Sequence, residues 1–233
     1  MAMDKFHIAR RTRLCFNVSF SAQMLANRQF IIYNSTNYFS GAVMKITCIN
    51  GSARENGSCN YFLDCFISGI GVSDAETIKY CVGKADLHFC KGCKKCYTDG
   101  RCVQNDDVSG IIGNILTSDI VAIAAPSYWA GVPAQLKTLI DRTTPYGDTN
   151  PNRIVTASKH IKGVAIAVRA GVREQENELI LNAIEHFYGH LGIDTVKRIS
   201  ITRTDTPDDL IGGHADEIGQ VKELGKALTQ GSI

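Results

Sequence analysis

Short apolar runs alternate with amphipathic helical stretches from Met44 onward, and this alternation limits the possible folds more than any other feature of the sequence. The run at 120–125 is continuously apolar and ends at Pro126, as expected of a central parallel strand buried on both faces. Strands that alternate with helices predict an α/β fold, in which helices cover both faces of a parallel sheet. The predicted strands, in chain order, are 45–50, 77–82, 120–125, 163–168 and 195–202.

Helices are predicted between and after these strands, because apolar residues recur there at helical spacing. The stretches are 59–67, 108–116, 136–140, 179–191 and 210–228. Asp106 and Asp107 stand where they can cap the second helix, and Pro133 suits the first turn of the third. Five strands connected in this way fit a doubly wound, flavodoxin-like sheet of order 2-1-3-4-5, with an edge strand at 195–202 that carries Lys197 and Arg198.

The chain of 233 residues, 44% hydrophobic and 21% charged, suits one globular domain. We assign residues 44–233 to that domain, with a cysteine-rich loop at 90–102. Residues 1–43 lack the strand–helix alternation, so we expect a poorly ordered N-terminal extension or an upstream start, with Met44 as the natural first residue. A net charge of +2 predicts no nucleic-acid partner, and no apolar run reaches the ~20 residues of a membrane span. Without the apolar core of an export signal, a cytoplasmic location is expected.

Four cysteines fall within thirteen residues, at the spacing C-x2-C-x2-C-x5-C. A regular helix or strand does not bring four thiols together at this spacing, whereas a loop wrapped around a small object does. Three cysteines in one knuckle favour a [4Fe–4S] cluster over a single ion. A zinc site, which commonly uses two knuckles and a longer spacer, and free or catalytic thiols remain open. The predicted ligands are Cys90, Cys93, Cys96 and Cys102.

Basic residues are interleaved with these thiols, namely Lys91, Lys94, Lys95 and Arg101. They form either a solvated charged loop or a set of cations that favours a reduced cluster and attracts an acidic redox partner. The other five cysteines are scattered. Cys48, Cys59 and Cys65 lie in strand or helix patterns, which predicts small buried hydrophobic residues.

A ligand of such a sheet binds beyond the carboxyl ends of the strands, where the loops after the first, third and fourth strands meet. The first loop, 51–58, precedes a helix whose free N–H groups favour a phosphate. It lacks both G-K-[ST] and G-x-G-x-x-G, so one phosphate is expected rather than two, and FMN fits. Its Gly and Ser residues would also serve simply to make a turn. The candidate contacts are Ser52, Arg54, Ser58, Cys59 and Asn60.

The second loop contains the single tryptophan of the chain, directly after a buried strand. Its aromatic pair can pack on a planar ring, while the alternative is a hydrophobic loop over the core or a subunit contact. The third loop, 169–176, follows the fourth strand and either walls in the isoalloxazine or is an ordinary charged helix start. The candidate contacts are Pro126, Ser127, Tyr128, Trp129, Ala130 and Gly131 in the second loop, and Ala170 and Gly171 in the third.

The combination resembles the NADPH-dependent FMN reductase superfamily and, within it, the iron–sulfur flavoproteins. The resemblance covers residues 44–233 and rests on Gly-Ser-Ala-Arg after the first strand, the four cysteines followed by Asp106-Asp107, and Tyr-Trp-Ala-Gly-Val-Pro-Ala-Gln-Leu-Lys leading to Asp141-Arg142. It implies FMN at the three loops, a [4Fe–4S] cluster on the four cysteines, and a homodimer or homotetramer in which the cluster loop of one subunit approaches the flavin of another. The third loop departs from the Gly-Gly-rich pattern usual in the family.

The expected function is that of an FMN-dependent oxidoreductase, which couples two-electron flavin chemistry to a one-electron cluster. The expected donor is NAD(P)H or a ferredoxin-like protein and the acceptor a small molecule, and no catalytic triad or dyad is predicted. One alternative is a cluster-free NAD(P)H-dependent FMN or quinone reductase. Another is a non-catalytic flavodoxin-like electron carrier or a zinc-stapled binding module.

Overall fold

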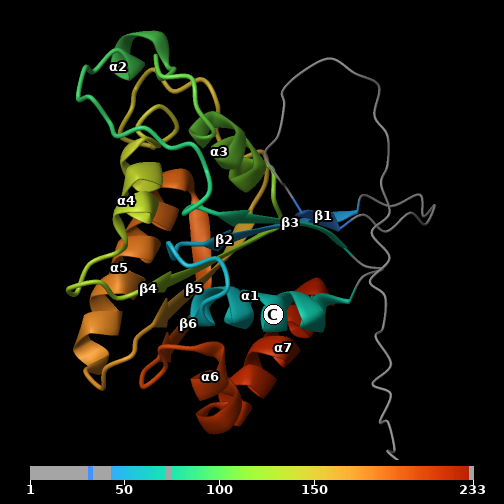
Figure 1. The fold of residues 1–233 in the computed structure, drawn as a ribbon. Helices are drawn as coiled ribbons and strands as arrows, with labels where there is room; N and C mark the ends of the chain where they lie inside the picture. The colour runs from blue at the N-terminus through green and yellow to red at the C-terminus, as the bar shows by residue number, and fades with distance from the viewer. Residues whose placement is uncertain (1–30, 34–42, 72–74, 231–233) are drawn as a thin grey trace, which may run out of the picture.

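The computed structural model describes residues 31–33, 43–71 and 75–230, and its strands form one sheet (Figure 1). The strand order is β1-β3-β2-β4-β5-β6. The strands are β1 (Ile31–Tyr33), β2 (Met44–Asn50), β3 (Ala75–Cys81), β4 (Ile120–Pro126), β5 (Ile161–Val168) and β6 (Ile193–Ile201).

Five of these strands, β3-β2-β4-β5-β6, pair in parallel and reproduce the predicted order 2-1-3-4-5. The doubly wound, flavodoxin-like sheet is therefore confirmed. β1 was not predicted: it pairs antiparallel with β3, with Ile32 opposite Ile78, at the outer side of the sheet. Residues 1–30 and 34–42 lie outside the described residues, so the expected disorder and upstream start of the N-terminal extension stay predictions.

Burial explains the positions of the strands. Every residue of β4 is buried, which the apolar run and its place in the middle of the sheet require. β6 lies at the edge of the sheet, as predicted, and only its terminal residues, Ile193 and Ile201, are buried. Its register with β5 shifts between Gly163 and Val164, which gives this edge a bulge.

Seven helices are described, and the predictions need three corrections. The helices are α1 (Ser58–Ile70), α2 (Cys96–Asp99), α3 (Val108–Leu116), α4 (Ala134–Asp141), α5 (Glu174–Leu191), α6 (Pro207–Gly213) and α7 (Ala215–Thr229).

The single helix predicted over 210–228 is two helices separated at His214. α6 begins earlier than predicted, because Thr206 and Asp209 form a capping box and Pro207 occupies the first turn. Pro133 precedes α4 as its N-cap residue and does not lie in the first turn.

The predicted pair of caps for α3 is half right. The Asp106 carboxylate accepts a hydrogen bond from the Val108 N–H at 3.3 Å, whereas the Asp107 carboxylate accepts one from the Asp86 N–H at 2.7 Å. Asp107 therefore serves the loop that precedes α3, and the helix start depends on Asp106.

The helices form two layers, with α3, α4 and α5 on one face of the sheet and α1, α6 and α7 on the other (Figure 1). Each layer encloses its own hydrophobic core against the sheet. Tyr188 of α5 is fully buried in the first core, and its hydroxyl donates to the backbone carbonyls of Val121 and Val164. None of the described helices is long and apolar enough to cross a membrane.

Two glycines allow α1 and α7 to pack with their backbones in contact. A Cβ added to Gly69 of α1 would lie 1.9 Å from the Lys222 carbonyl oxygen, and one added to Gly225 of α7 would lie 2.4 Å from the Phe66 carbonyl oxygen. Both neighbours are backbone atoms, which cannot rotate away. The two helices must therefore separate if either glycine gains a side chain.

We predict that Gly69→Ala lowers the free energy of unfolding by about 2–3 kcal/mol, because overpacking forces the α1 and α7 backbones apart. Urea denaturation followed by circular dichroism measures this change. Gly113→Ala is the matched control: Gly113 also lies within a helix but has nothing within 4 Å of the added Cβ. It should stabilise the protein by about 0.5–1 kcal/mol. Equal effects of the two substitutions would contradict the packing argument.

Candidate functional site: a shared sheet edge and an anchored cysteine loop

The turn after β2 is shaped by Asn50, a residue that sequence reasoning missed. Asn50 is buried, its side-chain oxygen accepts from the Ser52 N–H at 3.0 Å, and its amide donates to the Arg54 carbonyl at 3.1 Å. The Ser52 hydroxyl in turn accepts from the Arg54 N–H at 3.0 Å. The turn is thus held in one conformation by its own side chains before any ligand binds.

This turn leads into the N-terminus of α1, which is suited to an anion. Among the described residues no side chain caps this end of the helix at Gly57, so the first N–H groups and the helix dipole point toward the turn. Ser58 opens the helix, and its hydroxyl accepts from the Thr204 hydroxyl at 3.2 Å. Thr204 follows β6, so a fourth loop joins the three that were predicted.

Arg54 connects the turn to two other loops. Its guanidinium donates to the Asp205 carboxylate at 2.7 Å, and both side chains are largely exposed. The hydrogen bond that Arg54 donates to Asp205 raises the pKa of Arg54 and outweighs the opposing effect of desolvation, and the Tyr128 hydroxyl adds a smaller contribution. The loops after β2, β4 and β6 therefore meet at one cation.

The predicted aromatic loop contains a strained turn. Tyr128 and Gly131 exchange two backbone hydrogen bonds of 3.0 Å, and the two residues between them, Trp129 and Ala130, have φ of 53° and 59°. This is the geometry of a type I′ turn, which favours glycine or asparagine, so each residue costs about 1–2 kcal/mol. The Trp129 side chain is fully exposed, at 102%. Strain of this kind is found where a side chain must be presented.

The third loop is held by an internal ion pair. Arg169 pairs with Glu176 of α5, and its guanidinium lies 3.5 Å from the Ser127 hydroxyl of the second loop. Arg169 Nε is buried and has no hydrogen-bond partner among the described residues. A buried donor without a partner at a sheet edge is where a ligand oxygen or nitrogen would be expected. The Gly171 carbonyl accepts from the Arg203 N–H at 3.1 Å, which fixes this loop to the one after β6.

The structure therefore brings most of the predicted flavin residues to one edge of the sheet. Arg54 lies beside Tyr128 of the second loop, Ser52 shares the turn with Arg54, and Ser58 and Gly171 both contact the loop after β6. Two predicted residues need correction, because their side chains point elsewhere. The Cys59 thiol lies in the hydrophobic core, and the Asn60 amide donates to Asp64 one turn along α1. Only their backbone N–H groups remain for a phosphate.

The cysteine loop starts from the same edge and closes on itself. The Val82 N–H donates to the Asn50 carbonyl at 3.1 Å, directly after β3. Further along, residues 86–89 and 104–107 run side by side; we call this pair of segments the neck. Within it, the His88 N–H donates to Asp106, Gln104 donates to the Phe89 carbonyl, and Asp86 and Asp107 bind each other's backbone. The neck holds the two ends of the cysteine segment together.

Arg142, which follows α4, lies in the neck and forms a bidentate ion pair with Asp106. Its two terminal nitrogens donate to the two Asp106 oxygens at 2.6 and 3.0 Å, and one of them also donates to the His88 carbonyl at 2.6 Å. The two side chains are 2% and 1% exposed. Burial alone would raise the pKa of Asp106, but the hydrogen bonds from Arg142 and from the His88 N–H hold it below its ordinary value.

The four predicted metal-binding thiols gather around Cys96. Burial raises the pKa of Cys96, and nearby Cys102, Cys90 and Cys93 raise it further. Within the part of the chain that the structure describes, no three His, Cys, Asp or Glu side chains are arranged to bind one metal ion. Thiolates are the ligands that iron–sulfur clusters and structural zinc ions both use, so the donor set of this loop fits either group.

Three other cysteines lie in the hydrophobic core, as predicted. Cys48, Cys59 and Cys65 are buried. Burial raises the pKa of Cys48 and of Cys59 to about 12, so these thiols stay protonated and act as small hydrophobic side chains.

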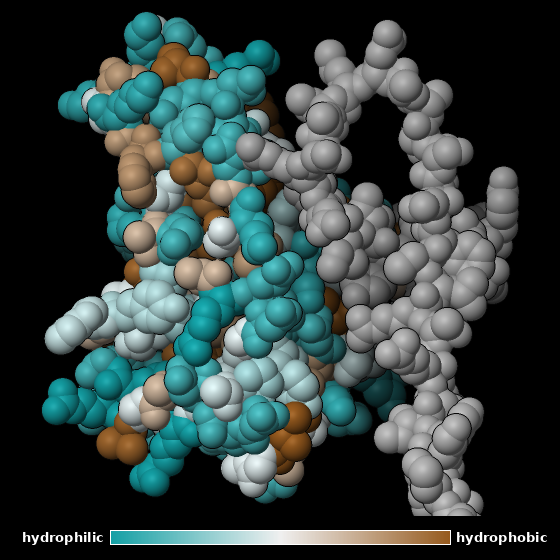
Figure 2. Space-filling view, viewed as in Figure 1, coloured by the Kyte–Doolittle hydropathy of each residue, from teal (hydrophilic) through white to brown (hydrophobic). Residues whose placement is uncertain are grey.

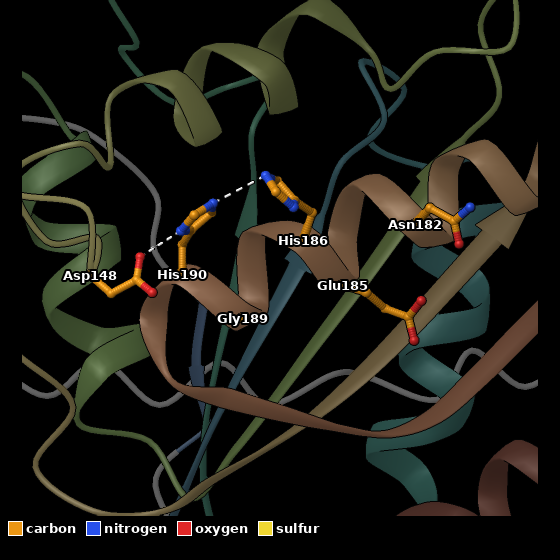
Figure 3. Close-up of a pocket in the computed structure, with 6 residues that line it drawn as sticks. All are labelled: Asp148, Asn182, Glu185, His186, Gly189 and His190. Carbon is orange, nitrogen blue, oxygen red and sulfur yellow. Dashed lines mark hydrogen bonds and ion pairs between the residues drawn. The ribbon is translucent and has the colours of Figure 1, made fainter.

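The segment after α4 supports the cysteine loop from a second side. Asn150 is buried, and its amide donates to the Cys96 carbonyl at 3.0 Å, while Asn152 donates to the Tyr97 carbonyl. The segment is fixed to α5 in turn. Asp148 binds His190 through its backbone N–H and, at 2.6 Å, through its carboxylate, and His190 contacts His186 at 3.1 Å beside a hollow of about 500 Å³ (Figure 3).

The cysteine loop and the flavin edge lie at opposite ends of α4. The aromatic loop leads into the start of α4 and protrudes from the left side of the molecule, whereas Arg142 ends the helix beneath the cysteine loop at the top (Figure 1). Eight helical residues correspond to about 12 Å. Basic and hydrophobic residues are both exposed around the cysteine loop, including Lys91, Arg101, Phe89 and Val103, and the top of the molecule shows this mixed surface in Figure 2.

Comparison with known proteins agrees with this architecture. Residues 44–202 match the family model described as NADPH-dependent FMN reductase. An iron–sulfur flavoprotein of Archaeoglobus fulgidus is 36% identical over 133 residues, which cover 57% of this chain and 58% of that protein. One from Methanosarcina thermophila is 29% identical over 173 residues, covering 72% of this chain and 87% of the relative.

Among solved structures, an NAD(P)H:quinone oxidoreductase from Methanothermobacter marburgensis superposes with a TM-score of 0.59 at 16% identity. The match covers 80% of this chain and 98% of that one, and it supports the fold. The matched family model spans most of the chain, including the loops after β2, β4 and β5. The chain therefore belongs to the NADPH-dependent FMN reductase family, and the expectation of an FMN-dependent oxidoreductase is confirmed at the level of that family.

Proposed function

We propose that this chain is an iron–sulfur flavoprotein, an FMN-dependent oxidoreductase that passes electrons between FMN at the sheet edge and a [4Fe–4S] cluster on Cys90, Cys93, Cys96 and Cys102. When bound, FMN supplies two-electron or hydride chemistry and the cluster supplies one-electron steps. The residues of the chain bind and orient both groups. One observation carries the proposal: a four-cysteine loop is held in a closed conformation by side chains other than its own thiols, on a domain of the FMN reductase family.

The turn after β2 is proposed to bind the FMN phosphate. The N–H groups at the start of α1 and the Ser52 and Ser58 hydroxyls supply donors to an anion, and Arg54 adds a positive charge. Asp205 now neutralises Arg54, and a dianionic phosphate would compete with this carboxylate for the guanidinium. The family membership and the uncapped helix support this assignment.

The loops after β4 and β5 are proposed to bind the isoalloxazine ring. Trp129 offers an exposed aromatic face, and the strained turn that carries it places Ala130 and Gly131 directly after it. On the other side, Arg169 Nε is a buried donor that lacks a partner among the described residues. Pro126 and Ser127 connect these two walls, because the Ser127 N–H donates to the Val168 carbonyl at 3.0 Å.

A second subunit is part of the proposal. In one chain, α4, a helix about 12 Å long, lies between the aromatic loop and the neck of the cysteine loop. A homodimer or homotetramer that brings the cysteine loop of one subunit to the flavin edge of another would shorten this path. We propose NAD(P)H or a ferredoxin-like protein as the donor, a small molecule as the acceptor, and the cytoplasm as the location. The exposed Lys91, Lys94, Lys95 and Arg101 suit an acidic protein donor.

The main competing function is a cluster-free NAD(P)H-dependent FMN or quinone reductase. It is favoured by the flavin edge itself, which is formed by loops after β2, β4, β5 and β6 without any contribution from the four cysteines. Iron and sulfide analysis of anaerobically purified protein, together with the rate of NAD(P)H oxidation, distinguishes the two.

We predict that the phosphate site accounts for a large part of flavin affinity. Wild-type protein should bind FMN at least tenfold more tightly than riboflavin, and Arg54→Gln should reduce this preference several-fold, because a charged donor to the phosphate is lost. Fluorescence quenching of both flavins in anaerobic titrations measures the two dissociation constants.

Arg153→Gln is the control for this prediction. Arg153 is exposed on the segment after α4, and the substitution removes the same charge away from the sheet edge. Its preference for FMN over riboflavin should equal that of the wild type. If Arg54→Gln and Arg153→Gln behave alike, the turn after β2 does not bind the phosphate.

We also predict that Cys93→Ser removes the cluster and keeps the flavin. Anaerobically purified wild-type protein should contain about four iron and four sulfide per chain with one FMN. Cys93 is exposed and makes no contact with the flavin edge among the described interactions, so its loss should lower the iron content several-fold without changing FMN content. Iron, sulfide and flavin assays measure all three.

Cys65→Ala is the control, which tests whether removing a cysteine outside the four-cysteine loop also lowers the iron content. Cys65 is buried in the core between the sheet and α7, and its substitution should leave iron and FMN at wild-type levels. Wild-type protein without iron, or equal loss of FMN and iron in Cys93→Ser, would contradict the proposed function.

A further inference from the structure

Arg142 is a buried cation at the base of the loop that carries the proposed cluster ligands. Two of its nitrogens bind Asp106 and the His88 carbonyl, two residues before Cys90, and Cys102 acts on the guanidinium electrostatically. Arg142 Nε is buried and has no hydrogen-bond partner among the described residues. The Nε–H group of Arg142 is therefore a donor that no described residue accepts.

The charge of Arg142 is maintained and is little screened by water. A guanidinium stays protonated in folded proteins, and two nitrogens of Arg142 bind the buried Asp106 carboxylate. By contrast, the basic residues within the cysteine loop, such as Lys91 and Arg101, are exposed. Water and salt screen exposed charges far more than a charge that is 2% exposed.

Hydrogen bonds and charges at the sulfurs set the reduction potential of an iron–sulfur cluster. Reduction adds negative charge, so a nearby cation favours the reduced form and a nearby anion opposes it. Arg142 is such a cation and Asp106 such an anion, and the two are bound to each other in the neck, where the two ends of the cysteine segment meet. Asp106 also holds the His88 N–H and the start of α3, which fixes the pair in position.

We propose that Arg142 and Asp106 are a positioning pair that orients Cys102 and sets the reduction potential of the cluster, with Arg142 raising the potential and Asp106 lowering it. This inference rests on the proposed function, because it requires the cluster. It assigns the control of the potential to two residues outside the cysteine motif and makes the other basic residues of the loop secondary.

The two substitutions should shift the potential in opposite directions. Arg142→Gln removes the cation and should lower the potential, while Asp106→Asn removes the anion, keeps an acceptor for Arg142, and should raise it. A tenfold change in the ratio of reduced to oxidised cluster at a fixed potential, which corresponds to about 59 mV for one electron, is the size we expect. A purely structural role would instead cause loss of iron in both variants without opposite shifts.

The test is an anaerobic redox titration of the full chain loaded with FMN, in which electron paramagnetic resonance and visible absorption follow the cluster. The variants are Arg142→Gln, Arg142→Lys and Asp106→Asn. Arg101→Gln controls for an exposed charge next to Cys102, and Arg198→Gln controls for an exposed ion pair on β6. We expect a lower potential in Arg142→Gln, a smaller shift in Arg142→Lys, a higher potential in Asp106→Asn, and wild-type values in both controls.

Distinct outcomes separate this inference from the proposed function. Wild-type protein without iron and sulfide overturns the proposed function and this inference with it. The inference alone is overturned if the wild type contains the cluster but the potentials of Arg142→Gln and Asp106→Asn shift in the same direction. It is also overturned if these potentials shift no more than that of Arg101→Gln. If Arg142→Gln binds FMN but no iron, its cluster potential cannot be measured, and the test then depends on Asp106→Asn. An unchanged or lowered cluster potential in Asp106→Asn overturns the inference. If both variants lose iron while FMN binding and thermal unfolding stay unchanged, the pair only holds the cysteine loop in place. That result also overturns the inference.

Discussion

The parallel alignment of β2, β4, β5 and β6 is the constraint on which the rest of the molecule depends. Because these strands run in one direction, their carboxyl ends meet at one edge and the loops that follow them must lie together. β4, buried throughout, fixes this geometry at the centre. The contacts of Arg54 with Asp205 and Tyr128, and of Arg169 with Ser127, are consequences of that alignment, since these residues are far apart in the sequence.

The conformation of the cysteine loop is not fixed by strand pairing, because the loop has almost no regular secondary structure. It is held by polar contacts from outside: Arg142 and Asp106 fix the neck, and Asn150 fixes the backbone of Cys96. Buried ion pairs add little net stability but are costly to break, so this pair determines the conformation of the loop more than it stabilises the domain. The flavin edge and the cysteine loop are thus built by two largely independent sets of interactions, joined by α4.

The sequence predicted the fold well, because apolar runs and helical periodicity report burial directly. It predicted the loops that carry the site, because topology decides which loops meet. It missed polar residues whose partners appear only in the folded chain. Arg142 and Asn150 bind backbone 54 residues away, and Asn50 shapes its own turn, yet all three look like ordinary polar residues in the sequence. The division of the last helix at His214 was invisible, because the apolar stripe continues across it, and only the Thr206–Asp209 capping box could have indicated an earlier start. The short β1 carries no pattern long enough to recognise.

The neck is held by hydrogen bonds that do not involve the four thiols, and this affects how the protein would respond to oxygen. Both ends of the cysteine segment are joined by backbone hydrogen bonds, and the hydrophobic cores on either side of the sheet contain none of its four thiols. If the proposed cluster is bound, its oxidative destruction would therefore leave the domain folded and the four cysteines on one closed loop. Repair then requires only fresh iron, sulfide and reductant, with no need to refold or replace the polypeptide.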